Sequence, residues 1–181
     1  MEDAALMAQV AAGQPEAMTG LFERHHRPLY GFLLRMTGHP AAAEDLVQEA
    51  FLRVLRHAAT FDARSPFRPW LYRIARNLLA DHHSRRGREP LAPLEAAELH
   101  DEGADPHAHA EARQDYARLE TALARLSFEQ RELLLLSRDP DLSYTELAAL
   151  YGCSAGALKV RVHRALQALR AQFHGDGEVS G

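Results

Sequence analysis

The sequence predicts an all-α protein with two small helical domains joined by a flexible acidic linker, the C-terminal domain containing a helix-turn-helix. Apolar residues recur at helical spacing through most of the 181 residues, and no segment alternates as a strand does. Residues 89–110 instead combine acids with prolines and contain no β-branched residue, which is typical of a linker. We expect a helical domain over 1–88, the linker over 89–110, a second helical domain over 111–174 and a disordered tail over 175–181.

Three helices are predicted in the first domain. The first ends at Gly38, the second spans about 41–59, and the third spans about 66–86. Each carries an apolar stripe at helical spacing, so the three can pack into one compact unit. On the third helix we expect one polar flank and one outer face. The flank holds Trp70, Arg73 and Asn77, and the outer face holds Tyr72 and Arg76.

The helix-turn-helix is predicted at residues 143–163. Ser143 is suited to cap the first helix, and Glu146 three residues later completes a capping box. The first helix is expected over 144–151 and ends at Gly152, which permits a sharp turn. The second helix is expected over about 155–172.

That second helix has a basic outer surface. Between residues 154 and 172 it contains four Lys or Arg and no acid. Its outward residues suit contacts with base edges, and its flanking cations suit phosphates. The alternative is an ordinary helical hairpin with an exposed basic face.

Composition and charge bound the class of protein. The chain is 46% hydrophobic and 25% charged, no apolar run approaches the roughly 18 residues of a membrane span, and Cys153 is the only cysteine. The acidic N-terminus does not look like a signal peptide, so we expect a cytoplasmic protein without membrane insertion. The net charge of −4 combines −3 over 1–20, +6 over 21–88, −7 over 89–112 and a balanced remainder.

Three stretches of the C-terminal domain resemble region 4 of the ECF-type sigma factors of bacterial RNA polymerase. They are 126–136 (LSFEQRELLLL), 142–148 (LSYTELA) and 156–165 (GALKVRVHRA). In that family this domain binds the minus-35 promoter element. The resemblance implies that double-stranded promoter DNA is contacted by Ser154, Lys159, Val160, Arg161, His163 and Arg164. Ala157 departs from the family, which usually has Thr there.

Two stretches of the first domain resemble region 2 of the same family. Residues 45–53 (DLVQEAFLR) resemble the helix that binds core RNA polymerase, which implies contacts from Asp45, Leu46, Gln48, Glu49 and Arg53. Residues 67–77 (FRPWLYRIARN) resemble the segment that melts and reads the minus-10 element. The implied contacts with the melted non-template strand come from Phe61, Asp62, Trp70, Arg73, Arg76, Asn77, Arg85 and Arg86.

The residue types of this segment suit an unpaired strand. An extruded base needs a pocket and a stacking surface, and the loop at 61–65 offers an aromatic ring and polar groups for both. Asn77 suits a base edge, and the arginines after it suit phosphates. Trp70 suits a plain core position equally well.

The resemblance implies a sigma factor that has no enzymatic activity and needs no cofactor. Its partners would be core RNA polymerase, promoter DNA and an anti-sigma factor. The acidic linker would thread through the polymerase, or serve only as a solubilising tether. Because phosphate neutralisation dominates DNA affinity, the acidic free chain should bind DNA poorly alone.

Two other functions remain open from the residues themselves. A stand-alone helix-turn-helix regulator would dimerise and bind DNA tightly without polymerase. A metal-dependent hydrolase would use histidines such as His100, His107 and His109 beside the linker acids. A metal needs ligands in fixed geometry, which such a linker does not supply, so we expect no metal site. The paired histidines are expected at the surface of their helices, and these are His25, His26, His82 and His83.

Overall fold

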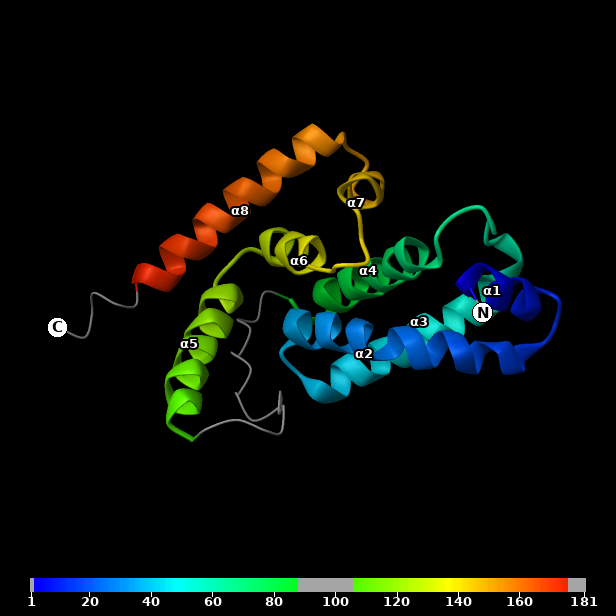
Figure 1. Ribbon diagram of the computed structural model, residues 1–181, viewed down its shortest axis with the longest axis horizontal. Helices are drawn as coiled ribbons and strands as arrows, with labels where there is room; N and C mark the ends of the chain where they lie inside the picture. Colours follow the sequence, from blue (N-terminus) through cyan, green and yellow to red (C-terminus); the bar gives the residue numbers. More distant parts are fainter. Residues whose placement is uncertain (1, 88–105, 176–181) are drawn as a thin grey trace.

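The computed structural model describes residues 2–87 and 106–175, and every regular element in these ranges is helical. We term residues 2–87 the N-terminal unit and residues 106–175 the C-terminal unit. The first contains α1 (Asp3–Ala11), η1 (Pro15–Ala17), α2 (Met18–Thr37), α3 (Pro40–His57), η2 (Ala58–Thr60) and α4 (Phe67–Arg86). The second contains α5 (Pro106–Ala124), α6 (Phe128–Ser137), α7 (Tyr144–Leu150) and α8 (Ala155–Gly175), as Figure 1 shows.

The N-terminal unit is built on α2, α3 and α4. Helix α2 ends at Gly38, whose φ of +70° is left-handed and whose backbone N–H donates to the carbonyl of Leu34 at 2.8 Å. Glycine is favoured at this position because a side chain would strain the left-handed backbone. Pro40 then begins α3, which packs against both α2 and α4. The three predicted helices are therefore confirmed, and α1 packs against α2 as a fourth.

The helix-turn-helix of the C-terminal unit is also confirmed. The Ser143 hydroxyl accepts the backbone N–H of Glu146 at 3.2 Å, and the Glu146 carboxylate accepts the backbone N–H of Ser143 at 2.8 Å. Gly152 has a φ of +62° and turns the chain after α7. Leu147 and Leu158 are fully buried in the corner between α7 and α8.

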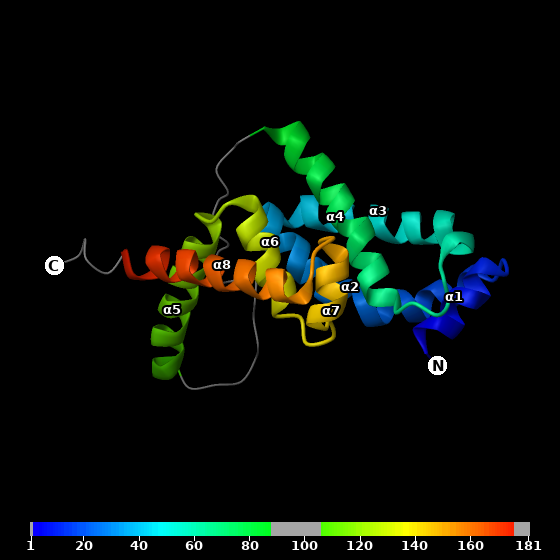
Figure 2. The same ribbon diagram turned by 90° about the horizontal axis from the view of Figure 1, so that it is seen from above.

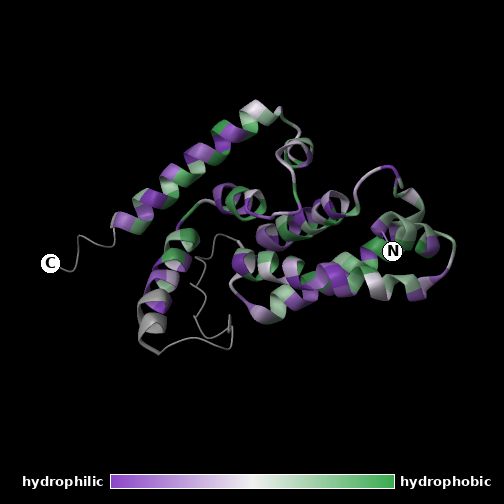
Figure 3. Cartoon of the chain, viewed as in Figure 1, coloured by the Kyte–Doolittle hydropathy of each residue, from purple (hydrophilic) through white to green (hydrophobic). Residues whose placement is uncertain are grey.

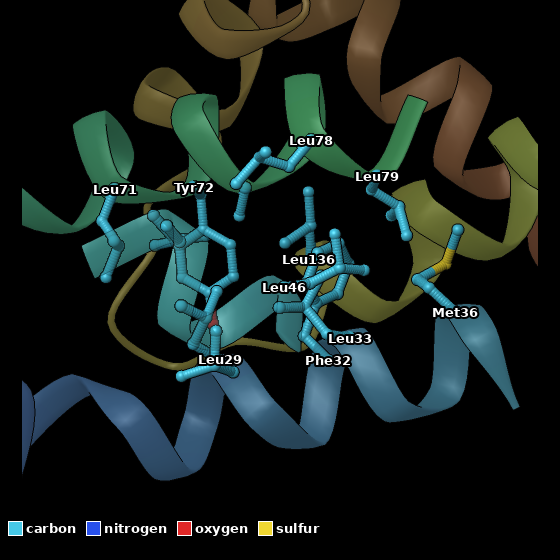
Figure 4. Packing of buried hydrophobic residues seen from close by; sticks show 14 of the residues in the cluster. Leu29, Phe32, Leu33, Met36, Leu46, Leu71, Tyr72, Leu78, Leu79 and Leu136 are labelled. Atoms are coloured by element: carbon cyan, nitrogen blue, oxygen red, sulfur yellow. The ribbon is translucent and has the colours of Figure 1, made fainter. Parts of the chain in front are cut away.

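The two units share one hydrophobic core. Helix α6 packs against α2, and α7 packs against α4, an arrangement visible from above in Figure 2. Leu136 of α6 is 1% exposed, and Figure 4 shows it between α2 and α4 among the buried side chains of the N-terminal unit. Burial of apolar surface therefore holds the units together.

The boundaries of the predicted linker and tail differ from those observed. Helix α5 begins at Pro106, within the predicted linker, because proline suits the first turn of a helix and the alanines that follow favour it. Helix α8 continues to Gly175, the first residue of the predicted tail. The rest of the predicted linker, 89–105, and of the tail, 176–181, lies outside the described residues.

The expectation of surface histidines is wrong for His25. Helix α1 covers this side chain, which is 7% exposed, and its Nε2 lies 2.7 Å from the Asp3 carboxylate. Burial lowers the pKa of His25, although Asp3 offsets part of that effect. Arg68 and Arg24 act in the same direction as burial. The folded protein therefore favours the neutral ring.

The buried corner of the helix-turn-helix generates a stability prediction. We predict that Leu158→Ala lowers the free energy of unfolding by about 2–5 kcal/mol, because it removes a fully buried side chain and leaves a cavity. Gln167→Ala, at an exposed position of the same helix, should change it by no more than about 0.5 kcal/mol. Urea denaturation followed by circular dichroism measures both, and similar losses in the two variants would contradict the packing.

The His25 environment generates a pH prediction. The pKa of His25 is lower in the folded than in the unfolded chain, so unfolding takes up a proton below the unfolded pKa of about 6.5. The free energy of unfolding is therefore retained above that pH and falls below it. We predict that His25→Gln loses less of it between about pH 7 and pH 5 than the unchanged protein does. Parallel losses in urea titrations of the two proteins would show that His25 does not titrate in this way.

Candidate nucleic-acid interface

The outer face of α8 is a continuous exposed surface. One side of the helix packs against α5, α6 and α7. Figure 3 shows hydrophilic and hydrophobic residues alternating along the length of α8. The opposite side carries a Lys, an Arg and a His around an apolar residue. These exposed residues are Lys159, Val160, His163 and Arg164. The face can therefore offer cations to phosphates and a small apolar contact to a base.

Ser154 and Arg161 lie at the edges of this face. The Ser154 hydroxyl accepts the backbone N–H of Ala157 at 3.2 Å, so it caps the helix. Arg161 is half-buried, with its guanidinium carbon 5.1 Å from the ring centroid of Tyr151. The structure thus brings together all six residues predicted on this helix, but gives these two a local role as well.

A second exposed surface lies on α4. Arg73 and Asn77 are exposed one turn apart, and Arg85 and Arg86 are exposed in the last turn. The Arg86 guanidinium lies 3.2 Å from His39 Nε2. One exposed side of α4 therefore presents Arg73 and Asn77, and its last turn adds the cations Arg85 and Arg86. These groups suit a base edge and a phosphate backbone.

The loop before α4 is folded by its own contacts. Asp62 accepts the Arg64 side chain with both carboxylate oxygens at 3.0 Å and the Arg64 backbone N–H at 3.0 Å, and these bonds lower the pKa of Asp62. Phe61 is half-buried and packs edge-on against Trp70, with 5.1 Å between the ring centroids. The aromatic pair therefore forms one wall beside an exposed, preformed turn.

Arg76 does not lie on the outer face predicted for it. Its guanidinium donates to the Glu132 carboxylate at 2.9 Å and to the Leu150 carbonyl at 3.0 Å, and it stacks 4.0 Å from the Tyr151 ring centroid. All three partners belong to the C-terminal unit. The expectation failed because helical periodicity in α4 does not reveal that α7 packs against this side.

Tyr72 is also misplaced by the sequence prediction, being 3% exposed. Its hydroxyl donates to Asp139 at 2.9 Å, and Arg68 donates to the same oxygen at 2.8 Å. Burial and the Asp139 charge raise the pKa of Tyr72. Asp139 lies between α6 and α7, so this is a second contact between the units.

A third contact joins α2 to α5. The Glu120 carboxylate accepts from Arg35 Nε at 3.1 Å and from the Tyr116 hydroxyl at 2.5 Å. Burial and the bond to Glu120 raise the pKa of Tyr116 to about 12, so the hydroxyl stays protonated as a donor. No pattern in the sequence marks these contact residues. A charged residue on an amphipathic helix looks the same whether solvent or another helix faces it.

The predicted face of α3 is only partly exposed. Asp45 and Gln48 are exposed, whereas Glu49 and Arg53 are half-buried and paired at 3.1 Å. Leu46 is 8% exposed and belongs to the core, so it does not lie on the surface that the prediction assigned it to. Its helical spacing places it with the apolar stripe of α3, between Ala43 and Ala50.

Exposed apolar side chains that the sequence analysis missed lie on the same unit. Leu52 is 47% exposed and Leu55 is 41% exposed. They follow Gln48 by four and seven residues, which places them on its face of α3. Phe22 of α2 is 39% exposed and helps to line a hollow of about 390 Å³ that Gln48 also lines. A helical-wheel projection that included apolar residues outside the core stripe would have found the leucines.

The described residues offer neither a metal cluster nor a membrane span. They contain no group of three or more His, Cys, Asp or Glu that could hold a metal ion. No helix among them is both long and apolar enough to cross a bilayer. Of the histidines considered for a metal, His100 and the side chains of His107 and His109 lie outside the described residues.

Comparisons with known proteins match segments of both units to one family. Residues 21–89 match the family model for Sigma-70 region 2, and residues 116–169 match that for Sigma-70, region 4. The chain is 34% identical over 172 residues to ECF RNA polymerase sigma factor SigC of Mycobacterium tuberculosis, covering 95% of this chain and 91% of the relative.

Solved structures agree with this match. CnrH, solved in complex with the cytosolic domain of CnrY, is 29% identical with a TM-score of 0.73, covering 96% of this chain and 98% of CnrH. The sigma factor RpoE from Bartonella quintana, solved with the anti-sigma factor NepR, is 28% identical with a TM-score of 0.65, covering 85% of this chain and 94% of RpoE. The chain, with its region 2 and region 4 matches in order and its similarity to SigC over nearly its whole length, belongs to the ECF sigma factors of RNA polymerase.

Proposed function

We propose that this sigma factor binds core RNA polymerase through α3, reads the minus-35 element through α8 and holds the melted minus-10 strand on α4. The observation that carries the proposal is the pair of exposed cationic faces, on α8 and α4, within the two segments that match sigma-70 regions. Residues 2–87 act as the region 2 domain and residues 106–175 as the region 4 domain. The chain acts in the bacterial cytoplasm as an initiation factor and not as an enzyme.

The minus-35 contacts divide by chemistry. Lys159 and Arg164 are exposed cations on either side of His163, so they suit phosphates and the acceptors on guanine. Val160, 51% exposed, suits the methyl group of thymine. Ser154 caps the helix whose N-terminal N–H groups favour a phosphate, and Arg161 flanks it.

The minus-10 contacts come from α4 and the loop before it. Arg73 and Asn77 meet the strand directly, Arg85 and Arg86 hold its phosphates, and Phe61, Asp62 and Trp70 border the site for an extruded base. Arg76 is available only after it leaves Glu132, Leu150 and Tyr151. A contact from Arg76 to the melted strand therefore requires the two units to move apart.

The polymerase contacts combine polar and apolar groups on α3. Asp45, Gln48, Glu49 and Arg53 supply the polar part, and exposed Leu52 and Leu55 supply the apolar part. Leu46 is excluded from this surface by its burial. An apolar centre with a polar rim is the usual composition of a protein–protein interface.

An anti-sigma factor is a further proposed partner. CnrH and the Bartonella RpoE were solved with CnrY and with the anti-sigma factor NepR, respectively, and both resemble this chain over most of its length. The partner would hold the units in an arrangement in which Arg76 stays occupied by the C-terminal unit.

Run-off transcription tests the proposed function. Core RNA polymerase with the chain should initiate from promoters of the chain's own organism that core polymerase alone does not use. Tight DNA binding by a dimer without polymerase, seen in a gel-shift assay, would support a stand-alone regulator instead.

One variant tests the reading of the minus-35 element. We predict that Arg164→Ala weakens initiation from minus-35-dependent promoters by about 1–3 kcal/mol if the guanidinium reads a base. Gln167→Ala, also exposed on α8, is the control and should leave initiation unchanged. Equal activity of the two variants would remove Arg164 from the site.

A matched pair of variants separates the two interfaces. Leu52→Asp and Val160→Asp each place a carboxylate at an exposed apolar position, 47% and 51% exposed. We predict that Leu52→Asp weakens capture by immobilised core polymerase at least about tenfold, as expected for an apolar residue at the centre of an interface. Val160→Asp should retain capture but lose initiation, because its carboxylate repels DNA phosphates. The reverse pattern would show that the surfaces are assigned to the wrong partners.

A further inference from the structure

Glu120 is a buried carboxylate that faces both units. It lies on α5 and is 5% exposed. In the packed arrangement its Oε1 accepts from Arg35 Nε of α2 at 3.1 Å and from Tyr116 of α5 at 2.5 Å. Arg35 also donates to the Tyr116 hydroxyl at 3.2 Å, and its side chain keeps 27% exposure. One partner of Glu120 is therefore lost when the units separate.

Arg131 is a buried cation with no hydrogen-bond acceptor for two of its nitrogens. It lies on α6, is 3% exposed, and its Nε and Nη1 are buried without a partner. Burial lowers its pKa, and the charge of Glu120 acts in the opposite direction. A buried guanidinium without acceptors is costly, so this arrangement leaves the C-terminal unit with an unmet requirement for a carboxylate.

The needs of Glu120 and Arg131 are complementary. In the packed units Arg35 of α2 holds the Glu120 carboxylate. The charge of Glu120 also acts on Arg131, the buried arginine that lacks acceptors. Separation of the units returns Arg35 to water, where its guanidinium is fully solvated. It also removes Arg35 from Glu120, which keeps only the Tyr116 hydroxyl of its own helix as a partner.

We propose that Glu120 exchanges partners, pairing with Arg35 when the units are packed and with Arg131 when they separate. Through the exchange the Glu120 carboxylate has one arginine partner in the packed arrangement and another in the separated one. The exchange therefore lowers the free-energy cost of separating the units. This deepens the proposed function, because separation is the step that releases Arg76 for the melted strand.

Distance measurements on the free chain test the exchange without polymerase or DNA. Spin labels at Arg56→Cys and Gln167→Cys, in a Cys153→Ser background, report the separation of the units by pulsed electron paramagnetic resonance. Both labelled positions are exposed, one in each unit. If the distances do not change as expected but run-off transcription succeeds, the exchange is rejected and the proposed function stands.

The two arginines should have opposite effects. Arg35→Gln removes the partner of the packed arrangement and should raise the separated population about fivefold, the ratio that corresponds to one part-buried ion pair. Arg131→Met removes the partner of the separated arrangement and should lower it by about the same factor. Arg24→Gln, an exposed arginine on α2 that pairs with Asp3 of its own unit at 2.8 Å, is the matched control and should leave the distances unchanged.

A rise or no change in the separated population with Arg131→Met would overturn the proposal. In a Glu120→Gln background the same substitution should have no effect, and a retained effect would assign it to another partner. Arg131→Lys should behave like the unchanged protein because it keeps the cation. If Arg131→Met does not fold, the test is the NMR chemical shift of the Arg131 Nε–H in the Arg35→Gln variant. A downfield shift relative to the unchanged protein supports a new hydrogen bond, and an unchanged shift overturns the proposal.

Discussion

The arrangement of this molecule depends on arginine–carboxylate contacts between its two helical units. Arg35, Arg68 and Arg76 of the N-terminal unit meet Glu120, Asp139 and Glu132 of the C-terminal unit. The side chains of the three acids are at most 8% exposed, so each carboxylate needs a cation or a donor to offset its loss of hydration. Buried pairs of this kind add little net stability, but breaking one without replacement is costly. They therefore favour an arrangement of the units in which all three carboxylates keep their arginines.

Helix α4 links this interface to function. Arg68, Tyr72 and Arg76, at four-residue spacing, form the side that faces the C-terminal unit. Arg73 and Asn77 follow Tyr72 and Arg76 by one residue and lie on the exposed side. One helix thus holds the C-terminal unit and carries the proposed minus-10 surface. The basic character of α4, which suits nucleic acid, is partly neutralised by the chain's own acids while the units are packed.

The sequence was sufficient for the local structure and insufficient for the interface. Capping at Ser143, the left-handed turns at Gly38 and Gly152, and the exposed face of α8 follow from short-range rules, and all are observed. His25 and Tyr72 were misplaced because another helix covers them, and periodicity reports only that a position is on a given side of its own helix. Leu46 was assigned to a binding surface by resemblance, although its spacing already indicated the core. No local sequence pattern marks Glu120, Asp139 and Glu132, the acids that pair with the arginines.

The most direct test is a double-mutant cycle on Arg68 and Asp139, the contact with the least exposed cation. Arg68→Ala, Asp139→Ala and the double variant are compared with the unchanged chain by urea denaturation of the full-length protein. A contact formed in solution between the units predicts a coupling free energy of about 1–3 kcal/mol. Additive losses, with a coupling below about 0.3 kcal/mol, would show that the units do not meet through this pair.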